Sequence, residues 1–420
     1  MTSAQQLGRM SVLRKRGVVS ILVAMCASRI AAGMIPFGLV TYFASRNDFA
    51  SAGFSSTIFM IAVSLSGPVK SRIIQKYAPG VIIVSMAIIS SVAFCLCIAS
   101  SFYLHSTIFA FLLIALGAIS APPTGAVVRS AWNQISGSPR EKKILHSIDS
   151  VMEEAVFALT PILTSIIWVS IGPQWGVPLG SIAGFIGSYI VVQVGKNSDA
   201  KKLFSINRKQ SQIEQNESCR NRGINSFRLY FSLKSVGLLL PSLGIGISIG
   251  TLTIVLPAWA SSYTKSQAIS GVILGVISLS GAISASCGDR LSPYKADERK
   301  KIIYYGVPLT VSLFLFSIAD NIFTEVLSAI MFGYGMTPIF VSSYMLVSAL
   351  YNEEFHTELN ASLGAAFNIG SGCSTAVVGS FIREIPINIL LLLLALVAFF
   401  LCVVAPWVGL RSVHDAEVAR

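Results

Sequence analysis

The sequence has few charged residues, few acidic ones and no recognisable catalytic or metal set. Asp, Glu, Lys and Arg make up only 12% of the 420 residues, with 19 acidic residues and 4 His. The seven cysteines form no CxxC pair and no Cys/His spacing, so neither a metal nor another cofactor is expected. There is no G-x-x-x-x-G-K-[ST] phosphate loop, which argues against direct use of ATP. Without a nucleophile–base pair, the chain is not expected to be an enzyme.

Hydrophobic residues dominate what is present. They make up 53% of the chain, and the mean hydropathy is +0.71, far from the usual mix of a soluble domain. A membrane helix needs roughly 20 apolar residues, and twelve such stretches are predicted, six before residue 200 and six after residue 230. They lie near 18–44, 52–69, 80–100, 105–130, 150–171, 176–195, 235–260, 268–287, 303–319, 323–350, 357–382 and 386–409.

A short motif occurs twice at a spacing of about half the chain. S-L-S-G is found at 64–67 and again at 278–281, a shift of 214 residues. ALGAISAPPTG and MFGYGMTPIF also align, which brings Pro122 onto Pro338 with a shift of 216 residues. Two markers with nearly equal shifts indicate an internal duplication. The predicted organisation is a six-helix half at 1–195, a polar cytoplasmic linker at 196–230 and a second six-helix half at 231–420.

Lys and Arg are unevenly distributed between the predicted loops. Arg46, Lys265 and Arg383 fall in one set of loops and Arg29 inside a span, whereas the rest of the 31 lie in the termini and the other set. Because cytoplasmic loops keep Lys and Arg, both termini are predicted to be cytoplasmic. The net charge of +12 then reflects membrane orientation, and such dispersed charges predict no nucleic-acid partner.

This pattern resembles the major facilitator superfamily over the whole chain. Two six-helix halves in the same orientation, related by an axis along the membrane normal and joined by a long inner loop, are the architecture of that family. The resemblance implies an all-α membrane protein with 12 transmembrane helices in two six-helix pseudo-symmetric halves. It also implies a monomer that moves a small molecule across the bilayer by alternating access.

The family motif G-x-x-x-D-R-x-G-R-R, in the turn between helices 2 and 3, is degraded here. Ser71 stands for the first Gly, Gln75 for Asp and Lys76 for Arg, while the weaker echo between helices 8 and 9 keeps Asp289-Arg290. In the family this turn latches the cytoplasmic side. The resemblance therefore implies gating residues at both turns and at neighbouring positions: Gly67, Arg72, Gln75, Lys76, Arg129, Gly281, Asp289 and Arg290.

A more specific likeness covers residues 129–161, RSAWNQISGSPREKKILHSIDSVMEEAVFALTP. This stretch is similar to the helix 4 to helix 5 hairpin of bacterial, drug-efflux-like members of the family. Those members also tend to carry an Arg in helix 1 and a T-E pair entering helix 11, which Arg29 and Thr357-Glu358 match. The Gly-Pro that marks antiporters in helix 5 appears here as Thr160-Pro161, so that signature is incomplete. The likeness implies a location in the bacterial cytoplasmic membrane.

Arg29 is the charge that is predicted deepest in the membrane. It lies 11 residues into its span, about 16 Å deep at 1.5 Å per residue, where an ionisable group is costly and is usually paired or functional. One interpretation is a substrate or counter-charge residue that faces a central cavity. The other is a structural pair with a carboxylate on a neighbouring helix, and the sequence favours neither.

Carboxylates cluster at the start of the fifth span. Asp149 and Glu153 are four residues apart and so share a helical face, with Glu154 beside them. Desolvation would favour their neutral form, which suits proton uptake and release. The alternative, a salt bridge to Arg129 or to the adjacent loop, is slightly favoured. Glu358 has the same two interpretations, and Asp320 and Glu325 are expected to be solvated.

Prolines and the missing motifs complete the prediction. Pro122, Pro161 and Pro338 would bend their helices and are candidate sites of gating motion. An apolar cavity with few charges favours proton-coupled efflux of a hydrophobic or cationic small molecule. Two alternatives stay open: import or facilitated passage of a small anionic solute that binds Arg29, and a non-transporting sensor or scaffold that acts through 196–228.

Overall fold

A computed structural model of the whole chain describes residues 17–76, 79–136, 138–197, 233–263, 268–291, 293–294, 297–351 and 353–410. Within these ranges some further side chains are not described, among them those of Arg72, Gln75, Lys76, Glu154, Asp289, Arg290 and Glu358. The roles predicted for these seven residues stay predictions.

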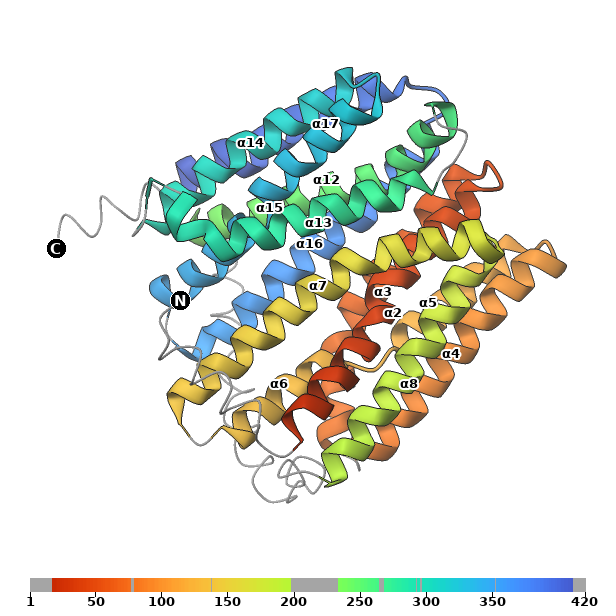
Figure 1. Cartoon of the computed structure of the whole chain (residues 1–420), viewed down its shortest axis with the longest axis vertical. Helices are drawn as coiled ribbons and strands as arrows, with labels where there is room; N and C mark the ends of the chain where they lie inside the picture. The colour runs from red at the N-terminus through yellow and green to blue at the C-terminus, as the bar shows by residue number, and fades with distance from the viewer. Residues whose placement is uncertain are drawn as a thin grey trace.

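The described chain is helical, and its helices form two groups that lie beside one another (Figure 1). The first group holds α2 (Val18–Ala44), α3 (Phe49–Lys76), α4 (Pro79–Tyr103), α5 (Thr107–Ser120), α6 (Thr124–Ile135), α7 (Pro139–Ile171) and α8 (Gly176–Asn197). The second holds α12 (Leu233–Tyr263), α13 (Ile269–Leu291), α14 (Glu298–Ile318), α15 (Ile322–Leu350), α16 (Glu353–Phe381) and α17 (Ile387–Phe399). Two short helical pieces, η1 (Pro173–Trp175) and η2 (Phe400–Val404), accompany α8 and α17.

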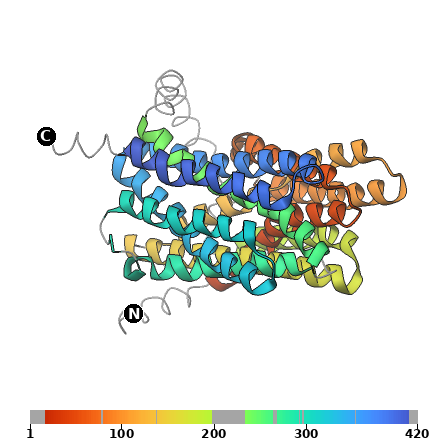
Figure 2. The same cartoon turned by 90° about the horizontal axis from the view of Figure 1, so that it is seen from above.

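The helices have the length and composition of membrane spans. Ten helical segments of the described chain are long and apolar enough to cross a bilayer, and α7 has a shorter apolar part at Ala155–Ile171. In both views the long helices run roughly parallel or antiparallel to one another (Figure 1 and Figure 2). The more polar α7 and α16 border the opposite half, α16 against α3 and α7 against α13. The expected all-α membrane fold in two halves is confirmed.

The fourth span is interrupted between α5 and α6. Here two consecutive prolines, Pro122 and Pro123, remove two backbone N–H donors and interrupt the helix, so carbonyls that precede them need other donors. Lys70 Nζ on α3 donates to the carbonyls of Ala118, at 3.3 Å, and Ala121, at 3.0 Å. Of the prolines predicted to bend helices, Pro122 thus lies in a break, whereas Pro161 and Pro338 lie inside continuous helices.

For orientation, we call the end of the bundle where α8 ends and α12 begins the linker end, and the opposite end the far end. The two halves contact one another along a seam that starts at the far end. There, a Cβ at Gly53 on α3 would collide with the carbonyl of Thr375 on α16, so only glycine permits this approach. Thr57 Oγ1 donates to the Gly372 carbonyl at 2.5 Å, and Asn368 Nδ2 donates to Ser64 Oγ at 2.9 Å.

The seam does not reach the linker end. Gly67 follows Ser64 by three residues on α3, and Gly364 precedes Asn368 by four on α16, so both continue the contacting faces. Within the part of the chain that the structure describes, a Cβ at either glycine would meet no atom of another segment within 4 Å. Among the described residues, α3 and α16 therefore leave open space at Gly67 and Gly364, on the linker-end side of Ser64 and Asn368.

Candidate functional site

The site begins with Arg29, whose guanidinium is buried and bound to a carboxylate on α7. Its side chain is 5% exposed and that of Asp149 is 1% exposed. Nη1 lies 3.2 Å from Asp149 Oδ1, and Nη2 lies 3.4 Å from Oδ2, a two-point contact that suits the planar guanidinium. Gly125 on α6 lies beside this group, since a Cβ there would be in ordinary van der Waals contact with Nη2, at 3.5 Å. Arg29 is thus paired with a neighbouring helix.

Arg129 and Glu153 extend this pair into a charge cluster of four residues: Arg29, Arg129, Asp149 and Glu153. Arg129 Nε lies 3.2 Å from Asp149 Oδ2, and its Nη2 lies 2.6 Å from Glu153 Oε2. Arg29 Nη2 also reaches Glu153 Oε2 at 3.5 Å. Two positive and two negative groups therefore balance one another, and each carboxylate contacts both guanidinium groups.

Local sequence explains how three helices bring these side chains together. Helix α7 begins at Pro139, with Ser138 as N-cap accepting from the Glu141 amide, so its register is fixed ten residues before Asp149. The four-residue spacing then turns Asp149 and Glu153 to one face.

On α6, Arg129 and Trp132 are three residues apart, and Trp132 Nε1 donates to Asp149 Oδ1 at 3.5 Å.

The charge cluster has a closed side and an open side. Asp149 and Arg29 are buried, whereas the side chains of Glu153 and Arg129 are 27% and 49% exposed. A buried ion pair is held in place because removing one partner leaves an uncompensated charge in a poorly solvated place. The partly exposed pair can exchange partners more cheaply. Within the charge cluster, Glu153 is therefore the carboxylate that is more accessible to solvent and less tightly held.

The two copies of S-L-S-G lie in different surroundings. In the first copy, Ser64 contacts the opposite half and Gly67 lies where the seam ends. In the second copy, Ser280 donates to the Ile330 carbonyl of α15 in its own half, and Gly281 packs closely against Thr337. The predicted gating positions Gly67 and Gly281 thus lie at an open interface and in a packed one, respectively.

Glu325 on α15 carries a buried carboxyl, so the prediction that it is solvated is wrong. It was expected to be solvated, yet it is 1% exposed, and no residue of the described chain donates a hydrogen bond to its Oε2. Asn321 caps α15 by accepting from the Thr324 amide, which puts Glu325 inside the first turns. The fully buried Ser328 and Ala329 follow three and four residues later, on the same face. In the sequence, the available signal for burial of Glu325 was its helical spacing from the small residues Ser328 and Ala329. Asp320, expected to be solvated as well, is exposed.

The sequence matches the Major Facilitator Superfamily over residues 18–319. The chain belongs to this family. No curated protein matches it, but many solved structures share its fold. The crystal structure of a mutant of the nucleoside transporter NupG aligns with a TM-score of 0.72 and 14% identity, covering 94% of this chain and 99% of that chain. A mutant of the peptide transporter POT in complex with alafosfalin aligns with a TM-score of 0.66 and 14% identity, covering 97% and 99%.

Membership of this superfamily makes the chain a multi-pass membrane protein that functions in transport of a small molecule. At 14% identity the two solved structures show the shared fold and carry no substrate across to this chain. Which molecule is moved, in which direction and with which ion must be argued from the chain's own residues.

Proposed function

We propose that this protein is a proton-coupled secondary transporter that exports a small hydrophobic or cationic molecule by alternating access. The observation that carries the proposal is the half-closed seam: among the described residues, α3 and α16 contact one another from the far end to Ser64 and Asn368 and leave open space at Gly67 and Gly364. Such a conformation can receive a molecule from the linker end. By the distribution of Lys and Arg, that end is the cytoplasmic one.

Contacts at the far end give the closed side a set of bonds that opening must break. Besides the contacts of Gly53 and Thr57, the Arg383 guanidinium, which follows α16, donates to the backbone carbonyl of Asn47 between α2 and α3. Each of these contacts, two hydrogen bonds and the close approach at Gly53, joins a residue of the first half to one of the second. Rocking the halves about the middle of the seam would exchange the closed end for the open one, as in other transporters built from repeats.

Glu153 is the residue that we propose for proton coupling. It is the more exposed carboxylate of the charge cluster, and it lies on α7, a helix that borders the other half. Protonation would leave Arg29 and Arg129 with one carboxylate between them, and this imbalance would favour a rearrangement of α6 and α7. The 129–161 hairpin, which resembles that of drug-efflux-like members, supplies three of the four residues in the charge cluster.

The two other functions have less support. An anionic solute would have to replace both carboxylates at Arg29, whose side chain is 5% exposed and already bonded to Asp149. A scaffold role through 196–228 depends on a segment that lies outside the described residues. We further propose that the protein acts as a monomer in the bacterial cytoplasmic membrane with both termini inside. Glu154, Asp149 and Glu358 remain candidates beside Glu153 in coupling.

The test is proton movement in proteoliposomes that hold the purified protein and an internal pH dye, screened with lipophilic cations, neutral drugs and small organic anions. We expect a lipophilic or cationic compound to drive proton flux in the wild type and in Glu384→Gln, a matched change at an exposed far-end carboxylate. Glu153→Gln should bind the compound but lose the flux. Equal flux in Glu153→Gln would refute the coupling role, and flux driven only by anions would refute the substrate class.

A further inference from the structure

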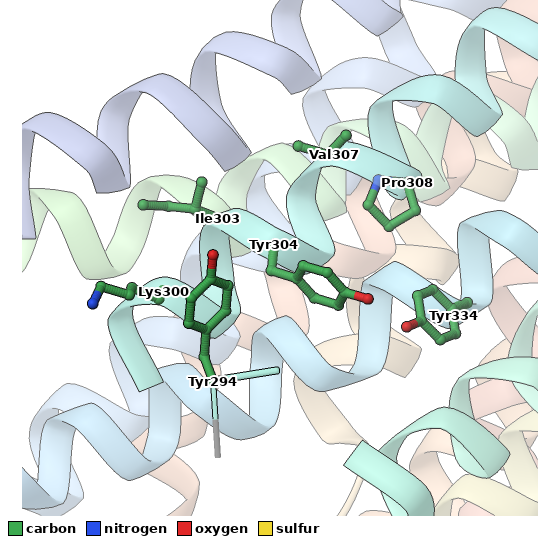
Figure 3. A pocket seen from close by; sticks show the side chains of 7 residues that line it. All are labelled: Tyr294, Lys300, Ile303, Tyr304, Val307, Pro308 and Tyr334. Atoms are coloured by element: carbon green, nitrogen blue, oxygen red, sulfur yellow. The ribbon is translucent and has the colours of Figure 1, made fainter. Parts of the chain in front are cut away.

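A cavity of about 410 Å³ lies in the second half, away from the seam (Figure 3). Its polar wall consists of Tyr294, Lys300, Tyr304 and Tyr334, and Figure 3 shows the Tyr304 hydroxyl pointing towards Tyr334. All its lining residues come from α14, α15 and the turn before α14. Because neither α16 nor α13 contributes a side chain, the cavity is not part of the space between the halves.

The cavity opens to the outside of the bundle. Val307 lines it and is 46% exposed, and the exposed side chains of Val311, Phe314 and Ile318 follow on α14 at spacings of four, three and four residues. Such spacing forms one continuous stripe along a helix. Since α14 is a candidate membrane span, this apolar stripe faces the acyl chains of the bilayer. The cavity lies at the linker end of this stripe, where Val307 lines it.

The mouth of the cavity is basic and carries tyrosines. Lys300 Nζ is exposed and lies 5.8 Å from the centre of the Tyr294 ring. Its acidic neighbour Asp297 is 3.4 Å away, in an exposed pair of the kind that contributes little stability and is readily exchanged. The next acidic group, Glu298, is already bound by Lys301 at 2.7 Å and by the Ser342 hydroxyl at 2.7 Å. It therefore does not compete for Lys300.

Charge and shape together indicate the class of ligand. From Asp297 to Lys301 the chain reads D-E-R-K-K, which leaves a net charge of one positive unit at the linker end of α14. Basic residues near the membrane surface attract anionic lipid headgroups. Tyrosine suits the same depth, since its ring is apolar and its hydroxyl can bond to polar groups at the interface. Further along α14 towards the far end, the cavity wall is formed by Val307 and Pro308, which offer only apolar contact.

We propose that this cavity binds one anionic phospholipid. Its phosphate lies at Lys300 beside Tyr294, the hydroxyls of Tyr304 and Tyr334 meet the glycerol and ester oxygens, and one acyl chain follows Val307 along α14. The site is separate from the charge cluster and from the seam. Its existence does not depend on which molecule the protein transports.

The test counts lipids on the full-length protein by native mass spectrometry after release from nanodiscs made of equal parts phosphatidylglycerol and phosphatidylcholine. Val307→Trp would fill the cavity. Ile89→Trp is the matched control, because Ile89 is 47% exposed and lies 10 residues into α4, the helix that corresponds to α14 in the other half. We expect the wild type and Ile89→Trp to retain one phosphatidylglycerol more than Val307→Trp.

Lys300→Gln keeps the cavity but removes the positive charge. Because Lys300 is exposed, we expect this variant to fold even if Val307→Trp does not. We expect it to retain phosphatidylglycerol several-fold less often than the wild type and to lose the preference over phosphatidylcholine. The proposal is overturned if Lys300→Gln keeps that preference, or if Val307→Trp retains as many anionic lipids as Ile89→Trp.

Discussion

Asp149 in the first half and Glu325 in the second are both 1% exposed, yet their surroundings are opposite. Asp149 accepts bonds from Arg29, Arg129 and Trp132. Glu325 has a carboxyl oxygen without a donor in the described chain, and no described Lys or Arg forms an ion pair with it. Equal burial thus does not mean equal compensation, although the charged form of a buried carboxyl needs partners that replace the lost water.

The difference separates a structural charge from a proton-binding candidate. With two guanidinium groups at its oxygens, Asp149 joins α2, α6 and α7. A carboxyl without a cation is more cheaply buried when it carries a proton. We therefore propose Glu325, on α15 near the far end, as a further candidate for proton exchange beside the carboxylates on α7 and α16.

The largest effect is expected for Asp149→Asn, which would leave Arg29 buried beside a neutral amide. Breaking a buried pair by removing one partner costs about 3–5 kcal/mol, so the unfolding temperature in detergent should fall by many degrees. Asp320→Asn, at an exposed carboxylate, should leave it unchanged. Replacing both partners, as Asp149→Leu with Arg29→Met, should recover part of the loss, because no unpaired charge remains. Equal unfolding temperatures for Asp149→Asn and Asp320→Asn would mean that the charge cluster does not hold the helices.

A small effect of the opposite sign is expected for Glu325→Gln. The amide has the shape of the protonated acid and cannot ionise, so stability should be unchanged or rise by up to about 1 kcal/mol. Thermal unfolding at neutral pH measures the change, with Glu384→Gln as an exposed control. A loss of stability comparable to that of Asp149→Asn would show that Glu325 is an ion with partners, and the contrast between the two carboxyls would disappear.

Much of this arrangement was predictable from the sequence, because it depends on short spacing or on composition. Apolar length and the repeated markers predicted the helices and the two halves, and the four-residue spacing put Asp149 and Glu153 on one face. That Arg29 bonds to Asp149 was not predictable, since the two are 120 residues apart and helix contacts decide the partner. Gly67 and Gly281 stand in identical tetrapeptides, yet only the packing of neighbouring helices makes one interface open and the other closed.

The central claim is that the halves exchange an open linker end for an open far end. The most direct test is a pair of spin-label distances in nanodiscs, in a background with the seven cysteines replaced by serine. One pair is placed at Gly67 and Gly364, the other at Ser51 and Ser380. We predict that a transported compound or a change in pH shortens the first distance and lengthens the second. Single, unchanging distances at both ends would contradict the account.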